Sequence, residues 1–150
     1  MEVFLVVGSE SGNAEMVGDC VRDELERRGH HVETFRGGSL ESARLPERDV
    51  VLIVCSSTGI GDLPQNVEPF FHELTGVRPS LAHVRYGLVG LGDRAYKESF
   101  LGGPRKWDAL MSELGAQRVG ERLELDATDH PAPDEDAVRW VGPWIDRIAT

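Results

Sequence analysis

The sequence predicts an α/β fold in which a doubly wound parallel sheet carries helices on both faces. Continuous aliphatic runs at residues 3–7 (VFLVV) and 50–55 (VVLIVC) are typical of strands that are covered on both sides. Segments whose apolar residues recur three and four positions apart lie between such runs, as helices do in a doubly wound sheet. Neither run approaches the length of a membrane span, so we expect no membrane association.

Five strands are expected along the chain. Residues 3–7 form the first strand, which we expect in place of a signal peptide because the amino terminus has no basic segment and no cleavage site. Residues 50–55 form the central strand, and residues 87–91 (GLVGL) form a further apolar strand. Residues 31–35 and 119–125 are expected to flank them.

Four segments have the apolar period of amphipathic helices, namely residues 13–28, 67–74, 103–114 and 138–148. Gly29 supplies a stop for the first of them. The polar, proline-containing stretch 126–136 is expected to be the loop before the last helix. With no internal repeat and no linker, residues 1–150 are expected to form a single domain.

The composition favours an acidic protein of the cytoplasm over several other classes. The formal net charge of −10 argues against nucleic acid and anionic membranes and favours a basic protein partner. Cys20 and Cys55 form no CxxC motif, so reduced thiols in the cytoplasm are expected. The five histidines have no metal-ligand spacing, and no metal site is expected.

Three loops follow the first, third and fourth expected strands and would converge on one crevice. The first loop, residues 8–15 (GSESGNAE), brings hydroxyls and an amide to a helix amino terminus, which suits a phosphate; a plain helix cap is the alternative interpretation. It lacks the Walker A pattern GxxxxGK[ST] and the dinucleotide-binding pattern GxGxxG.

The second loop, residues 56–66 (SSTGIGDLPQN), contains two glycines that allow close approach to a flat ligand. The third loop, residues 90–100 (GLGDRAYKESF), contains Tyr96, either a stacking platform or a partly buried side chain.

Taken together, these three loops resemble those of the short-chain bacterial flavodoxins, in particular the MioC-like group, and of the FMN domains of sulfite reductase and cytochrome P450 reductase. The first loop resembles the FMN phosphate loop (S/T)x(S/T)G(N/T)(A/T), and the third resembles G-L-G-(D/N)-x-x-Y. The resemblance implies a five-stranded sheet in the order 2-1-3-4-5. Flavodoxin is itself a standard example of ligand binding at the switch point of such a sheet, so that rule adds no independent support.

The resemblance also implies which residues would hold FMN. The phosphate would be held by Ser9, Glu10 (through its backbone only), Ser11, Gly12, Asn13 and Ala14. One side of the isoalloxazine would be lined by Ser57, Thr58, Gly59, Ile60 and Gly61, and the other by Leu91, Gly92, Asp93, Tyr96 and Phe100, with Tyr96 stacked on the ring. Asp126 would lie near the flavin. Thr58 departs from the pattern, since many relatives have an aromatic residue there.

The implied function is electron transfer without a catalytic side chain, since the redox chemistry belongs to the cofactor. Electrons would pass from an NADPH-dependent flavin reductase with a basic docking face to an unknown acceptor enzyme, and the carrier would be a monomer. Alternatives are a non-redox accessory protein that uses the flavin structurally and an FMN-dependent NAD(P)H:quinone oxidoreductase. A phosphoacceptor signalling domain fits poorly, because it needs an acidic cluster after the first strand and an acceptor aspartate after the central strand, where this chain has Gly8–Glu10 and Ser56.

Overall fold

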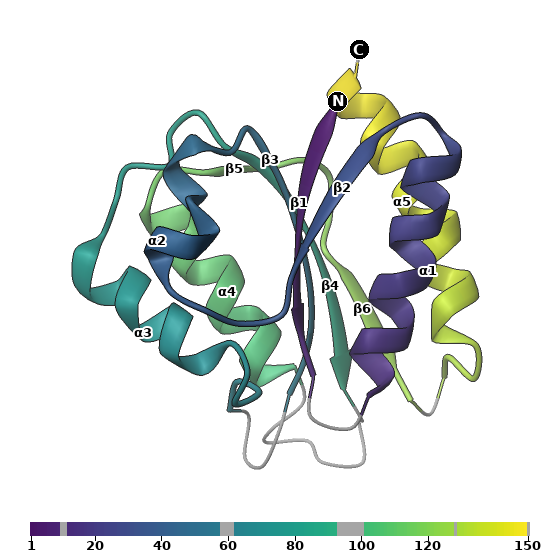
Figure 1. Cartoon of the computed structure of the whole chain (residues 1–150). Helices are drawn as coiled ribbons and strands as arrows, with labels where there is room; N and C mark the ends of the chain where they lie inside the picture. The colour runs from purple at the N-terminus through teal and green to yellow at the C-terminus, as the bar shows by residue number, and fades with distance from the viewer. Residues whose placement is uncertain (10–11, 58–61, 93–100, 128, 150) are drawn as a thin grey trace.

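A parallel sheet lies between two helix layers in the computed structural model, which describes residues 1–9, 12–57, 62–92, 101–127 and 129–149. The strands are β1 (Glu2–Gly8), β2 (His31–Phe35), β3 (Val50–Ser56), β4 (Arg85–Gly92), β5 (Gln117–Arg118) and β6 (Leu123–Asp126). The helices are α1 (Asn13–Arg27), α2 (Leu40–Ala43), α3 (Glu68–Val77), α4 (Gly102–Glu113) and α5 (Pro133–Ala149), with a 3-10 turn at Leu45–Glu47. Figure 1 shows α1 and α5 on one face and α2, α3 and α4 on the other.

The strand order confirms the predicted topology. It runs β2-β1-β3-β4-β5, with β6 also paired to β4, and every pairing is parallel. The chain passes from β1 to β2 on one side and then returns to β3 on the other side of β1. The switch point therefore lies between β1 and β3, at the edge where both strands end.

Strand alternation divides the buried side chains into two cores. Val3, Leu5 and Val7 face the core beneath α1 and α5, whereas Phe4 and Val6 face the core beneath α2, α3 and α4. The helices pack the expected apolar stripes against the sheet. In α1 the buried residues include Ala14, Val17, Val21 and Leu25. Burial of an aliphatic side chain contributes about 1.5–3 kcal/mol to the stability of the fold, so the packing on both faces of the sheet stabilises it.

The fifth strand of the sheet is broken in two, which the sequence did not predict. Residues 117–118 pair with the start of β4 and residues 123–126 pair with its end. Residues 119–122 therefore lie opposite residues 87–88 alone, as in a bulge. Gly120 allows the detour, because its φ of 71° is a left-handed conformation that glycine adopts without strain.

The last helix begins earlier than expected. Residues 126–136 were predicted to be a loop, which is wrong for residues 133–136, because α5 begins at Pro133. Proline suits the first position of a helix, and Asp134, Glu135 and Asp136 in the first turn are stabilised by the partial positive charge there. The short helix α2 was also missed; a capping box between Ser39 and Ser42 starts it.

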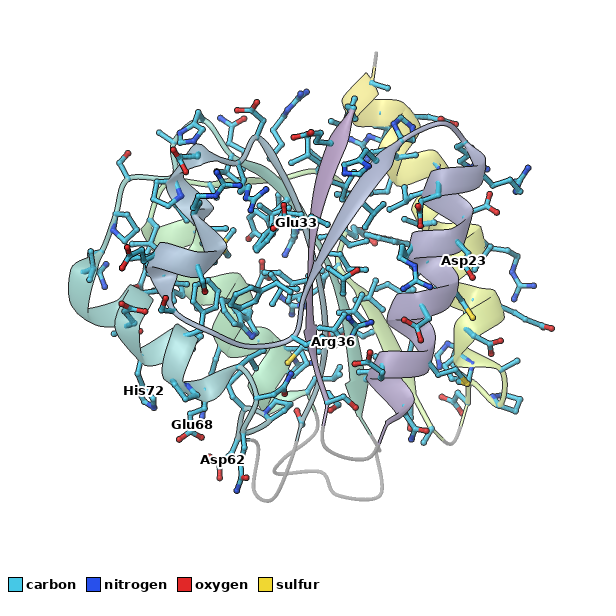
Figure 2. The ribbon with its side chains drawn as sticks, in the orientation of Figure 1. Asp23, Glu33, Arg36, Asp62, Glu68 and His72 are labelled. Atoms are coloured by element: carbon cyan, nitrogen blue, oxygen red, sulfur yellow. The ribbon has the colours of Figure 1, made fainter. Side chains whose placement is uncertain are left out.

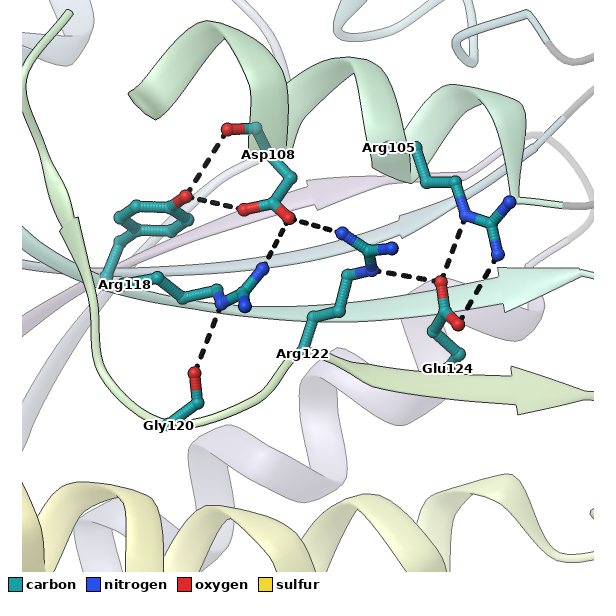
Figure 3. A network of polar contacts seen from close by, with 7 residues as sticks. Arg105, Asp108, Arg118, Gly120, Arg122 and Glu124 are labelled. Carbon is teal, nitrogen blue, oxygen red and sulfur yellow. Dashed lines mark hydrogen bonds and ion pairs between the residues drawn. The ribbon is translucent and has the colours of Figure 1, made fainter. Parts of the chain in front are cut away.

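A polar network ties α4 to the broken strand (Figure 3). Asp108 of α4 accepts a hydrogen bond from the hydroxyl of Tyr86 at 2.5 Å, and its Oδ2 lies 2.6 Å from a guanidinium nitrogen of both Arg118 and Arg122. Arg122 also reaches Glu124 at 3.0 Å. One buried carboxylate thus links the helix to Arg118 of β5 and to Arg122 at the end of the bulge.

Candidate functional site at the carboxyl edge

The predicted binding residues begin where four strands end. Gly8 of β1 lies beside Cys55 of β3, Ser56 lies beside Leu91 of β4, and Gly92 lies beside Asp126 of β6. We call this row of strand ends the carboxyl edge; it lies at the bottom of the sheet in Figure 1. The structure therefore brings Leu91, Gly92 and Asp126 to one edge, together with Ser9 and Ser57, which directly follow β1 and β3.

The first loop leads into α1 with neutral donors. Gly12 is the N-cap residue with φ 91°, and its amide donates to Ser9 Oγ at 3.0 Å. Among the described residues, a side chain added at Gly12 would meet no atom within 4 Å, which leaves space there for a ligand. Ala14 is buried and offers only its backbone, whereas Asn13 is exposed. The amides of a first helical turn point toward such a space and attract an anion.

Glu15 in the first turn of α1 would repel a phosphate unless it were neutralised. It forms an ion pair with Arg36, which follows β2 and lies near the lower end of that strand in Figure 2. The same guanidinium lies 3.2 Å from Asp19. Arg36 therefore draws Glu15 toward β2 and offsets its charge.

Asn66 contacts the first loop although it belongs to the second. Its Oδ1 accepts from the amide of Ser9 at 3.1 Å, and its Nδ2 donates to the carbonyl of Val7 at 2.7 Å. The amide of Ser9 is thus occupied, and its hydroxyl oxygen accepts from the amide of Gly12, so only the O–H of Ser9 can donate to a ligand. The sequence alone did not connect Asn66 with Ser9, because no local spacing relates residues 57 positions apart.

The second loop is fixed to the start of α4. The amide of Ser57 donates to the carbonyl of Leu91 at 3.2 Å, and Ser57 Oγ accepts from the amide of Gly103 at 3.0 Å. A side chain at Gly103 would lie 2.8 Å from the carbonyl oxygen of Asp62 and 3.1 Å from that of Ser56. Only glycine allows this close approach of helix and loop.

Asp126 ends β6, and the residue is 1 % exposed. Its backbone amide donates to Nδ1 of His130 at 2.9 Å, and its carbonyl accepts from the amide of His130 at 2.8 Å. These bonds close a tight turn after β6. They fix the position of the Asp126 backbone at the carboxyl edge.

The remaining predicted contacts lie outside the described residues, and these are Glu10, Ser11, Thr58, Gly59, Ile60, Gly61, Asp93, Tyr96 and Phe100. The stacking of Tyr96 and the substitution at Thr58 therefore stay predictions. The part of each loop that is described leads toward the same edge.

Thiol chemistry does not operate at this edge. Cys20 and Cys55 are both free cysteines, and burial raises the pKa of Cys55 to about 12. Burial and the nearby carboxylates of Asp134, Asp23 and Asp19 also raise the pKa of Cys20. Both side chains are therefore thiols at neutral pH and poor nucleophiles.

Two further absences hold for the described ranges. Within them, no group of three or more His, Cys, Asp or Glu side chains is arranged to hold a metal ion. No described helix combines the length and the apolar character needed to cross a bilayer.

Comparison with known proteins identifies the family. A family model described as flavodoxin matches residues 5–140. The chain belongs to the flavodoxin family. It is 36% identical to Protein MioC of Escherichia coli K12 over 98% of both chains, and 39% identical to Flavodoxin YqcA of the same organism over 95% of both. Among solved structures, a cysteine-to-alanine mutant of flavodoxin from Pseudomonas aeruginosa superposes with a TM-score of 0.88 at 31% identity, covering 95% of both chains.

Flavodoxins are FMN-binding electron carriers rather than enzymes, and the family places this chain in that class. The donors of the first loop suit the phosphate of FMN, because the loop offers it backbone amides and a hydroxyl. The described residues of the loop include no lysine or arginine. The predicted resemblance to the FMN domain of sulfite reductase is also confirmed. The chain is 32% identical to the Aliivibrio fischeri sulfite reductase flavoprotein alpha-component, in a match that covers 98% of this chain and 24% of that protein.

Proposed function

We propose that residues 1–150 form one domain that binds a single FMN at the carboxyl edge and shuttles electrons. The observation that carries this proposal is the amino terminus of α1, which follows β1 at the carboxyl edge to which Ser57 and Leu91 also belong. A flavodoxin from Fusobacterium nucleatum with TM-score 0.76 and 18% identity has been crystallised with flavin mononucleotide. Bound FMN would supply the redox chemistry.

Each group of residues would have a separate task. The amides at Asn13 and Ala14 and the hydroxyl of Ser9 would hold the phosphate, together with Ser11 and the backbone of Glu10. Gly12 would join them by exchanging the bond from its amide to Ser9 Oγ for one to a phosphate oxygen. Ser57 to Gly61 and Leu91 to Asp93, with Tyr96 and Phe100, would enclose the ring and exclude water from it. Asp126 would lie at the flavin edge beside Gly92.

A titration of the apoprotein with FMN tests this proposal. We expect the flavin fluorescence to be quenched with a stoichiometry of one FMN per chain at micromolar concentrations, and the visible bands of the flavin to shift on binding. Calorimetry on the same samples provides the affinity. An apoprotein that ignores FMN at these concentrations would refute the proposal.

The finer role that we propose is transfer from an NADPH-dependent flavin reductase with a basic docking face to an acceptor enzyme, by a monomeric protein of the cytoplasm. The net charge of −10 supports a basic partner. Acidic side chains stand near the carboxyl edge in the first turn of α5, and Asp23 points outward from α1 (Figure 2). Complementary charge would speed the encounter.

Salt should slow electron transfer from such a reductase. At limiting carrier concentration the second-order rate should fall as sodium chloride is raised, because ions screen the attraction between the two proteins. Glu135→Lys, at an exposed position near the carboxyl edge, should lower the rate several-fold at low salt. The measurement is stopped-flow reduction of the flavin.

Glu2→Lys is the matched control, because it changes the net charge equally at the amino end of β1, the opposite edge of the sheet. The rate for this variant should stay near that of the wild type. A rate that does not depend on salt, or two variants that slow the reaction equally, would show that the acidic residues near the carboxyl edge do not steer the partner.

A further inference from the structure

The side chain of Asn66 joins three backbone segments at the carboxyl edge. Oδ1 accepts from the amide of Ser9 at 3.1 Å, while Nδ2 donates to the carbonyls of Val7 at 2.7 Å and Arg36 at 2.9 Å. A carboxamide has two N–H donors, and both are used here. The side chain is therefore fixed in one orientation, because exchanging its oxygen and nitrogen would place the oxygen against two carbonyls.

We propose that Asn66 is a positioning residue for the phosphate of the flavin, an inference that rests on the proposed FMN site. Ser9 is the first residue after β1, and Asn66 holds its amide. The hydroxyl of the same serine accepts from the amide of Gly12, the N-cap of α1. Asn66 thus fixes the starting point of a short loop whose other end is the helix terminus that meets the phosphate.

Tight packing prevents the anchor from moving. An added side chain at Gly37 would lie 2.6 Å from the carbonyl oxygen of Asn66, and the φ of Gly37 is 136°. The turn after β2 therefore presses directly against the backbone of Asn66. Arg36 in the same turn pairs with Glu15 of α1. The first loop is held on one side by Asn66 and on the other by this ion pair.

The anchor also joins two parts of the proposed site. Asn66 is the last residue of the second loop, whose earlier residues would line the ring, whereas its side chain holds the loop for the phosphate. Loss of the anchor should therefore harm recognition of the phosphate more than recognition of the ring. Riboflavin, which has the same ring and no phosphate, separates the two effects.

Asn66→Asp tests the inference with almost no change of shape. The variant loses both donors and places a carboxylate against two carbonyls, so the loop should shift. We expect the dissociation constant for FMN to rise about tenfold to a hundredfold, while that for riboflavin changes by less than about threefold. Asn66→Ala removes the anchor without adding charge and should show the same selective loss.

Gln65→Glu is the matched control for charge, because it adds a negative charge at the neighbouring exposed residue and leaves the anchor intact. Its FMN affinity should stay within about threefold of the wild type. The exchange of the Ser9 amide proton with solvent gives a direct readout, since it should be faster in both Asn66 variants and unchanged in Gln65→Glu.

The outcomes separate this inference from the proposed function. A wild-type protein that binds no FMN would overturn both. A wild type that binds FMN, with Asn66 variants that weaken FMN and riboflavin equally or leave both unchanged, would overturn the positioning role alone. Urea unfolding of each apoprotein shows that the variants are folded, and Asn66→Ala decides the matter if Asn66→Asp does not fold.

Discussion

Asp108→Ala should destabilise the protein by about 3 kcal/mol, the lower end of the cost of breaking a buried ion pair. The variant would leave two arginines without their shared carboxylate and would remove the 2.5 Å acceptor of the buried Tyr86 hydroxyl. The lower end applies because the side chains of Arg118 and Arg122 are 34% and 33% exposed and can be hydrated again. Urea unfolding followed by circular dichroism measures the change.

Glu113→Ala provides the control for Asp108→Ala on the same helix. Glu113 forms an exposed ion pair with Arg78 at 3.4 Å, and such pairs contribute about 0–1 kcal/mol. We therefore expect little change in the unfolding free energy. Equal losses for the two variants would show that the network around Asp108 contributes no more than an ordinary surface pair.

The stability that Asp108 contributes should disappear in acid. Burial alone would raise its pKa, but hydrogen bonds from Tyr86 and Arg122 and the charges of Arg118 and Arg122 outweigh burial and lower the pKa below its ordinary 3.8. The folded state thus binds this proton less readily than the unfolded state, so the contribution is present above the ordinary pKa and is lost as the pH falls through the lowered one. The difference in unfolding free energy between wild type and Asp108→Asn should shrink below about pH 4.

Gly103→Ala should destabilise the protein by about 1–3 kcal/mol and weaken FMN binding at least tenfold. The new methyl group would lie 2.8 Å from the carbonyl oxygen of Asp62 and 3.1 Å from that of Ser56, so α4 and the second loop must separate. That movement would stretch the bond between the Gly103 amide and Ser57 Oγ. Urea unfolding measures the first effect and FMN titration the second.

Gly76→Ala is the same substitution where space is available. Gly76 lies in α3, and an added methyl group would meet no atom of the described residues within 4 Å. Alanine has the higher helix propensity by about 0.8–1 kcal/mol, so this variant should be slightly more stable and should bind FMN as the wild type does. Two variants with the same sign of stability change would contradict the proposed close contact at Gly103.

The sequence predicted well those elements whose buried residues follow a regular pattern of apolar residues along the chain. The aliphatic runs of β1 and β3 have both faces covered, and the stripe of α1 repeats every three to four residues. The first turn of α5 was missed because its three acidic residues resemble a solvated loop, although a helix amino terminus favours them. The break after β5 depends on the register against β4, which no local pattern encodes.

The sequence predicted which loops form the candidate site, but not the side chains that hold these loops in place. The loop motifs indicated that Ser9, Ser57, Leu91 and Asp126 belong together, and the strand register brings them to one edge. The side chains that fix the loops were not predictable, because their partners are remote in sequence. Asn66 holds Ser9, and Arg36 holds Glu15, through contacts that exist only in the folded chain.

At high protein concentration, another molecule should not readily add a strand to the edge of the sheet formed by β5 and β6. An outer strand with a long regular row of amides and carbonyls is a template on which another molecule can add a strand. Here the row lasts for residues 117–118, is interrupted by the detour through Gly120, and resumes for residues 123–126. The bulge therefore protects the carrier against edge-to-edge aggregation.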